Sequence, residues 1–476
     1  MKVKEVALEN FRGFERASIE IRPLTVLLGA NSSGKSSFGH ALAAMAHAQS
    51  SQVASTRATL TAAPQDADKW PVDLGSLDDL RHYGASGPVR IGLLTSEGWV
   101  RWAFGNDPSS RDRANLSVSE LEFPVGGSPG LAGASSTISE RRNATSAQPF
   151  AASGYQYVGS VPNLADQAVF TRLGPVEWYS NAQNQNVQIN FEGLVPNSIL
   201  HLGGTAVLLN NVVRNEVLSL LENLDYLRAA RTRPVRAFAT AVPADGQAIG
   251  YSGEWTAALL NRRAKDLINM ATPPNQSGQP VKARWADQEY TLESAVDFWL
   301  RMLGLAVSVR SVPRPEDTSR LQIQIELVKG QPHDITEVGF GVSQVLPVLV
   351  AGLLQSKDGL LVVDLPEAHL HPRPQADLGD FFCSLALSGR TSLVETHSEM
   401  FINQLRLRVA ENPGLTELIA VYFIDQLDDR GHCSQPKRIG IGRRDELKWP
   451  LGFMQEGWEI ETRIQRAYDH RGRAGE

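Results

Sequence analysis

Cysteine and long apolar runs are scarce in this sequence of 476 residues. Cys383 and Cys433 are its two cysteines, far apart in the chain, which argues against a disulfide framework and favours a reducing compartment. The longest apolar stretch, from Val345 to Leu354, is too short to span a bilayer. The first residues show neither the apolar core nor the cleavage site of a signal peptide. We therefore expect a cytoplasmic protein without a membrane partner.

Charge of one sign is not in large excess either. Lys and Arg total 46 and Asp and Glu total 52, which gives a formal net charge of −6. This balance does not indicate nucleic-acid binding through bulk electrostatics, although a local basic groove is compatible with it. Neither an internal repeat nor a long heptad pattern is visible. The length predicts two or three domains.

Short strands and helices alternate near both ends of the chain. Strands are expected at 2–9, 15–21 and Thr25–Leu28, followed by a helix over residues 35–48. The alternation returns after residue 320, with strands at Leu321–Leu327, Leu360–Asp364, Thr391–Glu395, 418–424 and 436–441 and helices beginning near Ser343, Pro374 and Glu399. Such alternation predicts a mainly parallel sheet whose two halves flank a large insertion.

This pattern divides the chain into five parts. Residues 1–105 and 319–445 form the two halves of the α/β domain. Residues 106–150, rich in Ser, Gly, Ala and Pro, are expected to be a flexible loop or insertion. Residues 151–318 are expected to be a central, mostly helical insertion, with helices near 206–224, 254–271 and 291–304. Residues 446–476 form a short C-terminal segment.

A glycine-rich turn joins the strand Thr25–Leu28 to the first helix. Gly29 to Ser36 fit the pattern G-x-x-x-x-G-K-[ST], in which glycines let backbone N–H groups point at phosphate oxygens. Lys35 is expected to reach the β- and γ-phosphates of ATP, and the Ser36 hydroxyl to bind Mg²⁺. A chance match in a polar turn is the alternative, but the strand and helix that this P-loop requires are both present. The residues predicted to bind the nucleotide here are Gly29, Asn31, Ser32, Ser33, Gly34, Lys35, Ser36 and Ser37.

The second candidate group follows two later strands. Asp364 ends an apolar strand, where a carboxylate can hold Mg²⁺ directly or through water. Glu367 is placed to polarise an attacking water, or else only caps the next turn. His397 is placed to contact the γ-phosphate or that water, or else is an ordinary loop residue. His369 and His371 resemble a metal-binding pair, but a structural role or a subunit contact is the stronger interpretation.

Together these motifs resemble the ABC-type ATPases of the RecF, SMC and OLD (overcoming lysogenization defect) branch. The resemblance rests on Glu9-Asn10-Phe11-Arg12-Gly13-Phe14, Val338 to Pro347, Pro366 to Pro372 and Thr396-His397-Ser398. It is closest to a bacterial subgroup of OLD-like AAA proteins with a short C-terminal domain of unknown function, which has counterparts of Tyr226-Leu227, Arg231, Gly250 to Glu254 and Trp449 to Phe453. The resemblance implies a P-loop NTPase of the ABC ATPase head type, with mixed N-terminal strands and a mainly parallel core sheet split by a large α+β insertion.

The family resemblance also implies a mechanism. Two heads sandwich ATP, and Ser343 and Gln344 of the signature segment contact the γ-phosphate across a homodimer or higher oligomer. Relatives often work beside a separately encoded effector, a nuclease or toxin, in antiphage defence or DNA maintenance. The chain departs from many ABC ATPases at Leu365, where they carry a catalytic Glu, so slow hydrolysis is expected. It also lacks the coiled-coil arms of the SMC group and an acidic cluster typical of a Toprim nuclease.

Two functional hypotheses remain open from the sequence. The first is an ATP-driven switch that senses or clamps nucleic acid, and the second is an ATP-dependent scaffold that holds and releases a protein effector. A transporter subunit fits less well, because the signature segment and the size of the insertion are wrong for it. The basic residues that would contact DNA phosphates, or would simply form a solvated face, are Arg228, Arg231, Arg233, Arg236, Arg262, Arg263 and Lys265. For Arg231 the family counterpart implies another alternative, a position near the nucleotide.

Overall fold

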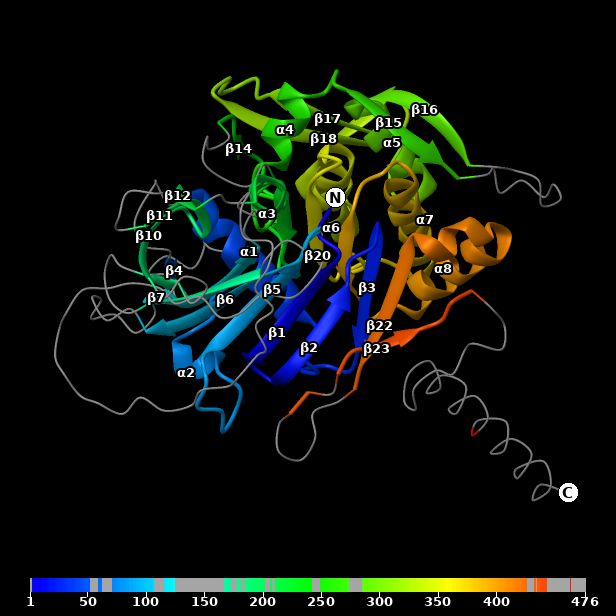
Figure 1. The fold of residues 1–476 in the computed structure, drawn as a ribbon. Coiled ribbons are helices and arrows are strands. Elements are labelled where there is room, and N and C mark those ends of the chain that lie inside the picture. The colour runs from blue at the N-terminus through cyan, green and yellow to red at the C-terminus, as the bar shows by residue number, and fades with distance from the viewer. Residues whose placement is uncertain are drawn as a thin grey trace, which may run out of the picture.

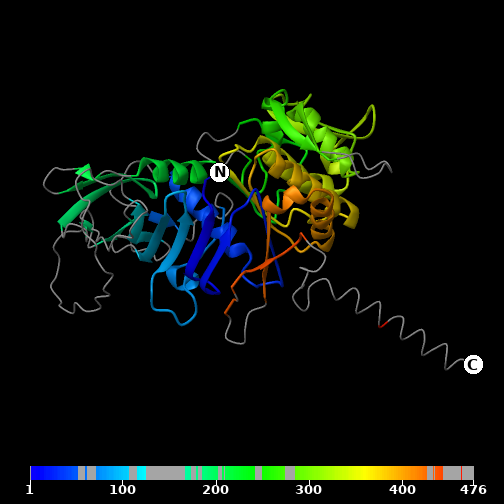
Figure 2. The same cartoon turned by 45° about the vertical axis from the view of Figure 1, so that its right-hand side comes forward.

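The computed structural model describes most of the chain and forms the basis of every structural statement below. The described residues are 2–51, 59–61, 71–106, 115–124, 167–172, 178–180, 185–201, 206–207, 210–241, 249–273, 285–425, 432–433, 435–442 and 463. Two large sheets lie next to each other, one antiparallel and one mainly parallel (Figures 1 and 2). Helix α1 (Ser36–Ser51) packs between them, so the residues that follow the P-loop belong to the core of both.

The mainly parallel sheet positions the candidate site. Its strand order is β13-β20-β21-β3-β22-β23, in which the first five strands are parallel and the last is antiparallel. The strands are β13 (Leu224–Leu227), β20 (Leu360–Asp364), β21 (Ser392–Glu395), β3 (Leu24–Gly29), β22 (Ile419–Ile424) and β23 (Lys437–Ile439). Every residue of β3, β20, β21 and β22 is buried, as expected for strands covered on both faces. The predicted fold class is confirmed.

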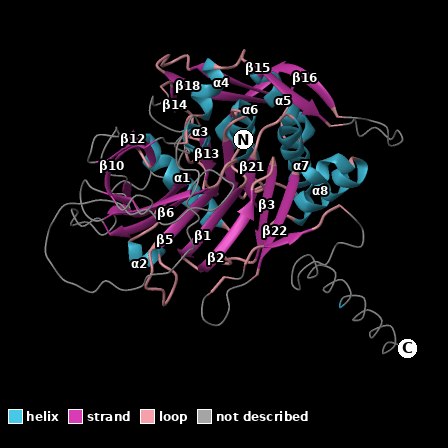
Figure 3. Cartoon of the chain, viewed as in Figure 1, coloured by secondary structure: helices cyan, strands magenta, loops and turns pink. Residues whose placement is uncertain are grey.

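Helices cover both faces of this sheet (Figure 3). Alternate strand residues such as Val26, Val363 and Val394 share one core with the helices α5 (Leu292–Met302), α6 (Phe340–Leu354), α7 (Pro372–Leu387) and α8 (Glu399–Glu411). The residues between them, such as Leu27 and Val362, share the other core with α1 and α3 (Asn211–Glu222). Among the described residues, no helix has both the length and the apolar character that crossing a bilayer requires.

The antiparallel sheet contains strands from both the N-terminal part and the insertion. Its order is β12-β11-β10-β9-β8-β7-β6-β5-β1-β2, and β4 pairs with β7. The strands are β1 (Glu5–Phe11), β2 (Phe14–Glu20), β4 (Thr59–Thr61), β5 (Val89–Leu94), β6 (Trp99–Asn106), β7 (Asn115–Pro124), β8 (Gln167–Arg172), β9 (Trp178–Ser180), β10 (Gln185–Glu192), β11 (Val195–His201) and β12 (Ala206–Val207), and the short α2 (Leu77–Leu80) lies nearby. Strand β7 corrects the prediction of a loop over 106–150, because its Leu116, Val118 and Leu121 are buried in the sheet core. The rest of that segment lies outside the described residues.

The central segment is richer in strands than expected. The helices near 206–224 and 291–304 are present as α3 and α5, but the expected helix over 254–271 is α4 (Thr256–Arg262) followed by a strand. A short apolar run does not distinguish a strand from a buried helix by periodicity, and pairing with β16 decides the outcome. The strands of the central segment around and after α4 are β14 (Phe238–Ala239), β15 (Leu267–Thr272), β16 (Ala286–Thr291) and β17 (Ser308–Pro313). After the central segment come β18 (Arg320–Val328), β19 (Gln331–Asp334) and two 3₁₀ turns, Ile335–Glu337 and Pro413–Glu417. The insertion is therefore α+β rather than mostly helical. The predicted C-terminal segment 446–476 lies outside the described residues apart from Arg463.

A buried ion pair fastens α8 to α7 and gives a test of stability. Arg408 donates from Nε and Nη2 to the two carboxylate oxygens of Asp380, both at 2.7 Å, and the Asp380 side chain is fully buried. Arg408→Met leaves that carboxylate buried without its counter-charge, so we expect the free energy of unfolding to fall by about 3–5 kcal/mol. Urea unfolding followed by circular dichroism measures it. Replacing the exposed Arg373 by Met is the control, and equal losses in the two variants would refute this role of the pair.

Candidate active site

The P-loop connects the carboxyl end of β3 to α1, as the sequence predicts. Gly29, Ser32 and Gly34 have φ angles of +148°, +61° and +91°, which curl the backbone around a central space. Glycine is required at position 29, because a Cβ atom there would lie 2.1 Å from the carbonyl oxygen of Ile424 on the neighbouring strand β22. The loop therefore has the conformation of a phosphate-binding turn.

The Lys35 side chain lies inside this curl. Its Nζ donates to the carbonyl oxygens of Gly29, at 3.1 Å, and Ala30, at 2.5 Å, and is 4.0 Å from Glu395 Oε1. The side chain is almost fully buried, and this burial lowers the pKa of the ammonium group. The positive charge is thus held where a phosphate would sit in the loop.

The strand order brings the second candidate group to the same place. Strand β21 lies between β20 and β3, and the Cα partners across these strands are Asp364 with Glu395 and Glu395 with Leu27. Because the strands are parallel, their carboxyl ends meet at one edge of the sheet, where the P-loop also begins. Gly29 to Ser36 and Asp364, distant in sequence, therefore share one site.

Asp364 is held by neighbours from three elements. The Tyr226 hydroxyl of β13 donates to Asp364 Oδ2 at 2.6 Å, and Nε2 of His40 on α1 lies 3.9 Å from the same oxygen. Burial raises the pKa of the carboxyl group, and the charge of Glu395 raises it further. A cation at this position would stabilise the ionised carboxylate, which is what a metal ligand requires.

Glu395 is a site residue that the sequence analysis did not identify. Burial raises the pKa of its carboxyl group, and the nearby Ser36 side chain lowers it by a smaller amount. Its Oε2 is buried and has no hydrogen-bond partner among the described residues. A carboxylate at the last position of a predicted parallel strand was the available signal. Its importance depends on β21 lying beside β3, which sequence spacing does not reveal.

Glu367 and His397 lie together after β20 and β21. Glu367 Oε1 accepts from the backbone N–H of His397 at 2.8 Å. Its Oε2 is buried without a hydrogen-bond partner in the described part of the chain, and burial raises the pKa of the group. The His397 ring is exposed, and desolvation, followed by the charge of Lys35, lowers its pKa. A neutral imidazole and a basic carboxylate are thus available near the P-loop.

The signature segment forms the start of α6, which begins at Phe340 rather than near Ser343. Ser343 is buried and donates from Oγ to the Phe340 carbonyl at 2.7 Å, and the buried Gln344 contacts the Ser343 hydroxyl. Phe340 packs edge-on against the ring of His369, with 4.9 Å between centroids. His371 precedes α7 as its N-cap residue. The exposed side chain of His371 makes no capping hydrogen bond.

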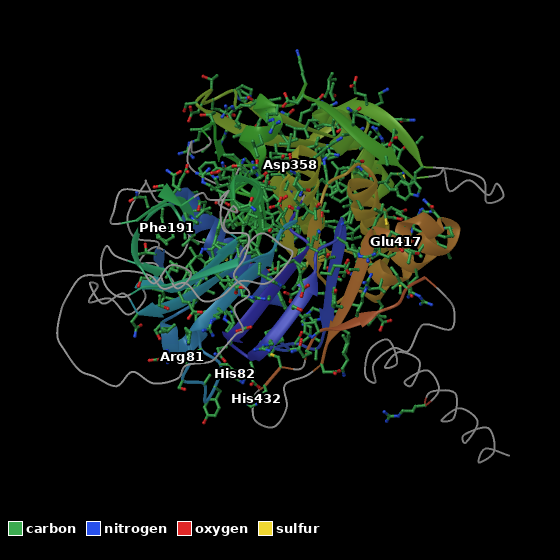
Figure 4. The ribbon with its side chains drawn as sticks, viewed as in Figure 1. Arg81, His82, Phe191, Asp358, Glu417 and His432 are labelled. Atoms are coloured by element: carbon green, nitrogen blue, oxygen red, sulfur yellow. The ribbon has the colours of Figure 1, made fainter. Side chains whose placement is uncertain are left out.

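A cavity of about 310 Å³ adjoins the P-loop. Arg12 on its wall donates to Nδ1 of His40 at 2.8 Å, and the Arg12 carbonyl contacts Nδ1 of His82. His82 and His432 lie together below the sheet, with their ring centroids 4.5 Å apart (Figure 4). A larger cavity, of about 470 Å³, lies at the opposite end of α1 and contains none of the predicted site residues. The residues lining the smaller cavity are Arg12, Gly13, Ser32, Gly34, Ser36, Ser37, His40 and Cys433.

Comparisons with known proteins give one family match and several similar solved structures. Residues 1–112 and 308–402 match the family described as AAA ATPase domain. No curated protein matches the chain. The SMC head domain from Thermotoga maritima is 10% identical, with a TM-score of 0.34 over 92% of this chain and 99% of that chain. The Smc head domain with an extended coiled coil, bound to the C-terminal domain of ScpA and derived from Pyrococcus furiosus, is also 10% identical, with a TM-score of 0.41 over 98% of this chain and 99% of that chain.

The family match and the site coincide. The two matched segments contain the P-loop, Asp364, Glu367, Glu395 and His397, and the residues between the segments lie outside the match. Two segments that flank the insertion therefore match the AAA ATPase domain family, and together they form a P-loop NTPase fold.

Proposed function

We propose that this protein binds ATP and Mg²⁺ between its P-loop and the ends of β20 and β21, hydrolyses ATP slowly, and uses the nucleotide to associate with a second copy. One observation carries the proposal. Lys35 and Ser36 of the P-loop both contact Glu395, whose Cα partner across the sheet is Asp364. A cationic and a hydroxyl group of the phosphate loop thus meet a pair of buried carboxylates, the arrangement that a metal-bound triphosphate requires.

The residues present fit both ligands. The P-loop offers the ammonium group of Lys35 and inward-facing amides for phosphate oxygens, while Ser36 and Asp364 would hold the metal. The buried Oε2 atoms of Glu367 and Glu395 lack hydrogen-bond partners among the described residues, so the site has acceptor capacity that its own side chains leave unused. When bound, Mg²⁺ polarises the γ-phosphate and neutralises its developing charge.

Two carboxylates are candidates to accept the proton of the attacking water. Burial raises the pKa of both Glu367 and Glu395, which makes each a better base than an exposed carboxylate. Leu365 occupies the position after Asp364, and its hydrocarbon side chain contributes no acid or base. Hydrolysis therefore relies on carboxylates one turn or one strand away, and we propose that turnover is slow for this reason.

Association would use the start of α6. Because α6 leads back into β20, its first turn lies at the same sheet edge as Asp364. Free N–H groups at a helix start favour an anion, so the exposed first turn at Gly339 and Phe340 would face the γ-phosphate bound by a partner copy. Ser343 and Gln344, predicted for this contact, lie buried one turn further along the helix. We propose a homodimer of this type, related to the OLD-like branch, that regulates a separately encoded effector in antiphage defence or DNA maintenance.

One observation favours the alternative of a scaffold without a direct DNA role. Of the basic residues considered for DNA contact, Arg231 is buried beneath the active site, Arg236 pairs with Glu337 and Arg263 pairs with Asp266. Internal pairing leaves fewer charges for phosphates. A clamp on DNA would then depend on a groove formed by the dimer rather than on one copy.

Gly339 allows the dimer to be tested apart from nucleotide binding. It caps α6 with an ordinary φ of −57°, and a Cβ atom there would meet nothing within 4 Å. Gly339→Glu should therefore fold and bind ATP normally, yet place a negative charge against the partner's γ-phosphate. We expect ATP to shift the wild type to a dimer in sedimentation velocity, and the Glu variant to stay monomeric. Gly339→Ser is the control, because serine is a favourable N-cap.

A DNA-binding titration separates the switch on DNA from the scaffold. Labelled duplex DNA is titrated at low and at physiological salt, with and without ATP. A switch on DNA predicts ATP-dependent binding that falls steeply with salt, since phosphate contacts release counterions. An ATP-induced dimer with no DNA affinity at low salt supports the scaffold. ATP-dependent dimerisation of Gly339→Glu equal to that of the wild type would refute the proposed interface.

A further inference from the structure

A short segment of the insertion, residues 224–232, runs beneath the candidate active site, and we call it the strap. It begins as β13, which adds to the sheet beside β20 with Tyr226 opposite Val362 and Leu227 opposite Val363. It then passes the end of β20, where Arg231 lies. Neither Tyr226 nor Arg231 belongs to the segments that match the AAA ATPase family, so the insertion supplies this edge of the site.

Arg231 binds the backbone at the end of β20. Its Nη2 donates to the carbonyl oxygen of Asp364 at 2.8 Å and to that of Leu365 at 3.3 Å, and its Nη1 donates to the Leu365 carbonyl at 3.2 Å. The side chain is only 6% exposed, although arginine is rarely buried without a function or an ion pair. The planar guanidinium donates to two successive carbonyl groups from nitrogens in fixed positions, whereas the ammonium group of lysine is a compact point charge.

Arg231 binds the turn at Asp364–Leu365 after β20, which we call the corner, and the backbone there has an unusual conformation. Leu365 has a φ angle of +45°, in the left-handed region that favours glycine, and such a residue persists only where its surroundings determine it. Its N–H donates to the Glu395 carbonyl at 2.9 Å, so one side of the corner is tied to β21. Arg231 ties the other side. Between these two contacts the chain turns so that Asp364 and Glu367 both face the P-loop region.

We propose that Arg231 is a positioning residue for ATP hydrolysis, holding the Asp364–Leu365 corner so that Asp364 and Glu367 are aligned with the nucleotide; this rests on the proposed function. Tyr226 acts in the same direction, because its hydroxyl fixes the Asp364 carboxylate itself. The insertion thereby sets the geometry of carboxylates that belong to the ATPase domain.

The strap also reaches the signature helix. Its Thr232 pairs with Ser252 through the Thr232 N–H at 2.8 Å and through their hydroxyls at 2.9 Å. The turn at Gly250 to Glu254 then abuts α6, where a Cβ atom on Gly253 would lie 2.5 Å from Pro347. The residues that hold the Asp364 corner are therefore in continuous contact with the helix that we assign to the dimer interface. Movement of the insertion would therefore displace both the Asp364–Leu365 corner and α6.

The test compares Arg231→Met and Arg231→Lys with Arg233→Met, an exposed arginine two residues further on. Hydrogen exchange without nucleotide measures the corner directly. The amides to follow are those of Ala368 and Leu370, bonded to the carbonyls of Leu365 and Glu367, and that of Leu365, bonded to the Glu395 carbonyl. We expect exchange over residues 364–371 to rise about tenfold or more in Arg231→Met, in keeping with the loss of charge-assisted hydrogen bonds. Exchange in β22 should stay unchanged, as should all exchange in Arg233→Met.

Turnover provides the second readout. We expect kcat to fall about 10²-fold in Arg231→Met while the Kd for ATP stays within about threefold, because misplaced catalytic groups affect the transition state more than binding. Arg231→Lys keeps the positive charge but lacks the planar pair of guanidinium donors, so exchange and kcat should return only partly to their wild-type values. If Arg231→Met does not fold, Arg231→Lys decides, and wild-type exchange and turnover in that variant overturn the proposal.

The two proposals fail in different ways. If the wild type does not bind ATP, the proposed function fails, while the exchange measurement, which uses no nucleotide, still shows whether Arg231 holds the corner. If ATP is bound and hydrolysed but residues 364–371 exchange at the wild-type rate in folded Arg231→Met, the positioning role is wrong and the proposed function stands.

Discussion

Lys35→Ala is expected to lower the affinity for ATP about 10²-fold, the largest effect on affinity of any substitution considered at this site. The ammonium group now bonded to the carbonyls of Gly29 and Ala30 lies where phosphate would sit, and it would exchange those contacts for charge-assisted bonds to the β- and γ-phosphates. Losing such bonds in a buried loop costs more than losing a surface ion pair. Isothermal titration calorimetry with ATP and Mg²⁺ measures the change.

The control for this experiment is Lys329→Ala. Lys329 is exposed at the turn after β18, far from the P-loop in the fold, so its loss should leave the affinity unchanged. Thermal melts of both variants establish that the protein is folded. Unchanged ATP affinity in folded Lys35→Ala would show that the P-loop is not the nucleotide site.

Glu367→Gln is expected to lower kcat about 10²-fold or more, which is the usual contribution of a general base. The amide keeps an oxygen to accept from the His397 N–H and removes only the basic charge, so the Kd for ATP should change little. Glu395→Gln should lower kcat and weaken ATP binding together, because Glu395 contacts both Lys35 and Ser36. Single-turnover hydrolysis and calorimetry on the same samples separate the two effects.

The outcome assigns the catalytic base. Normal turnover in Glu367→Gln removes this residue from the mechanism and leaves Glu395 as the candidate. Glu417→Gln is a suitable control, because the Glu417 side chain is 83% exposed at the far end of β22 (Figure 4). A similar loss of kcat in Glu417→Gln would indicate that sample preparation, and not the change at the site, lowers the activity.

The P-loop and the Asp364 strand could be predicted because each is a local signal. A glycine-rich turn between an apolar strand and a helix needs only adjacent residues, and an apolar run ending in one carboxylate is visible by itself. Their meeting in space followed from the parallel sheet that alternating strands and helices predict. These parts of the fold and site are therefore encoded over short stretches of sequence.

The parts that were missed depend on pairing between distant segments. Glu395 matters because β21 inserts between β20 and β3, an order that no local pattern contains. For Arg231 the sequence leaves two alternatives, a basic face or a position near the nucleotide, and its spacing does not show that the side chain turns inward to two backbone carbonyls. The strand β15 was taken for the end of a helix until its pairing with β16 was known. In each case tertiary contact overrides the local preference.

The central claim is that one metal-bound triphosphate lies between the P-loop and the ends of β20 and β21. An experimental structure with Mg²⁺ and a non-hydrolysable ATP analogue tests it most directly. We predict that Lys35 Nζ leaves the carbonyls of Gly29 and Ala30 for the phosphates, and that the metal lies about 2.0–2.1 Å from the Ser36 hydroxyl, with Asp364 bound to it directly or through water. A triphosphate bound elsewhere, for example in the larger cavity beyond α1, or a metal that contacts neither Ser36 nor Asp364, would contradict the account.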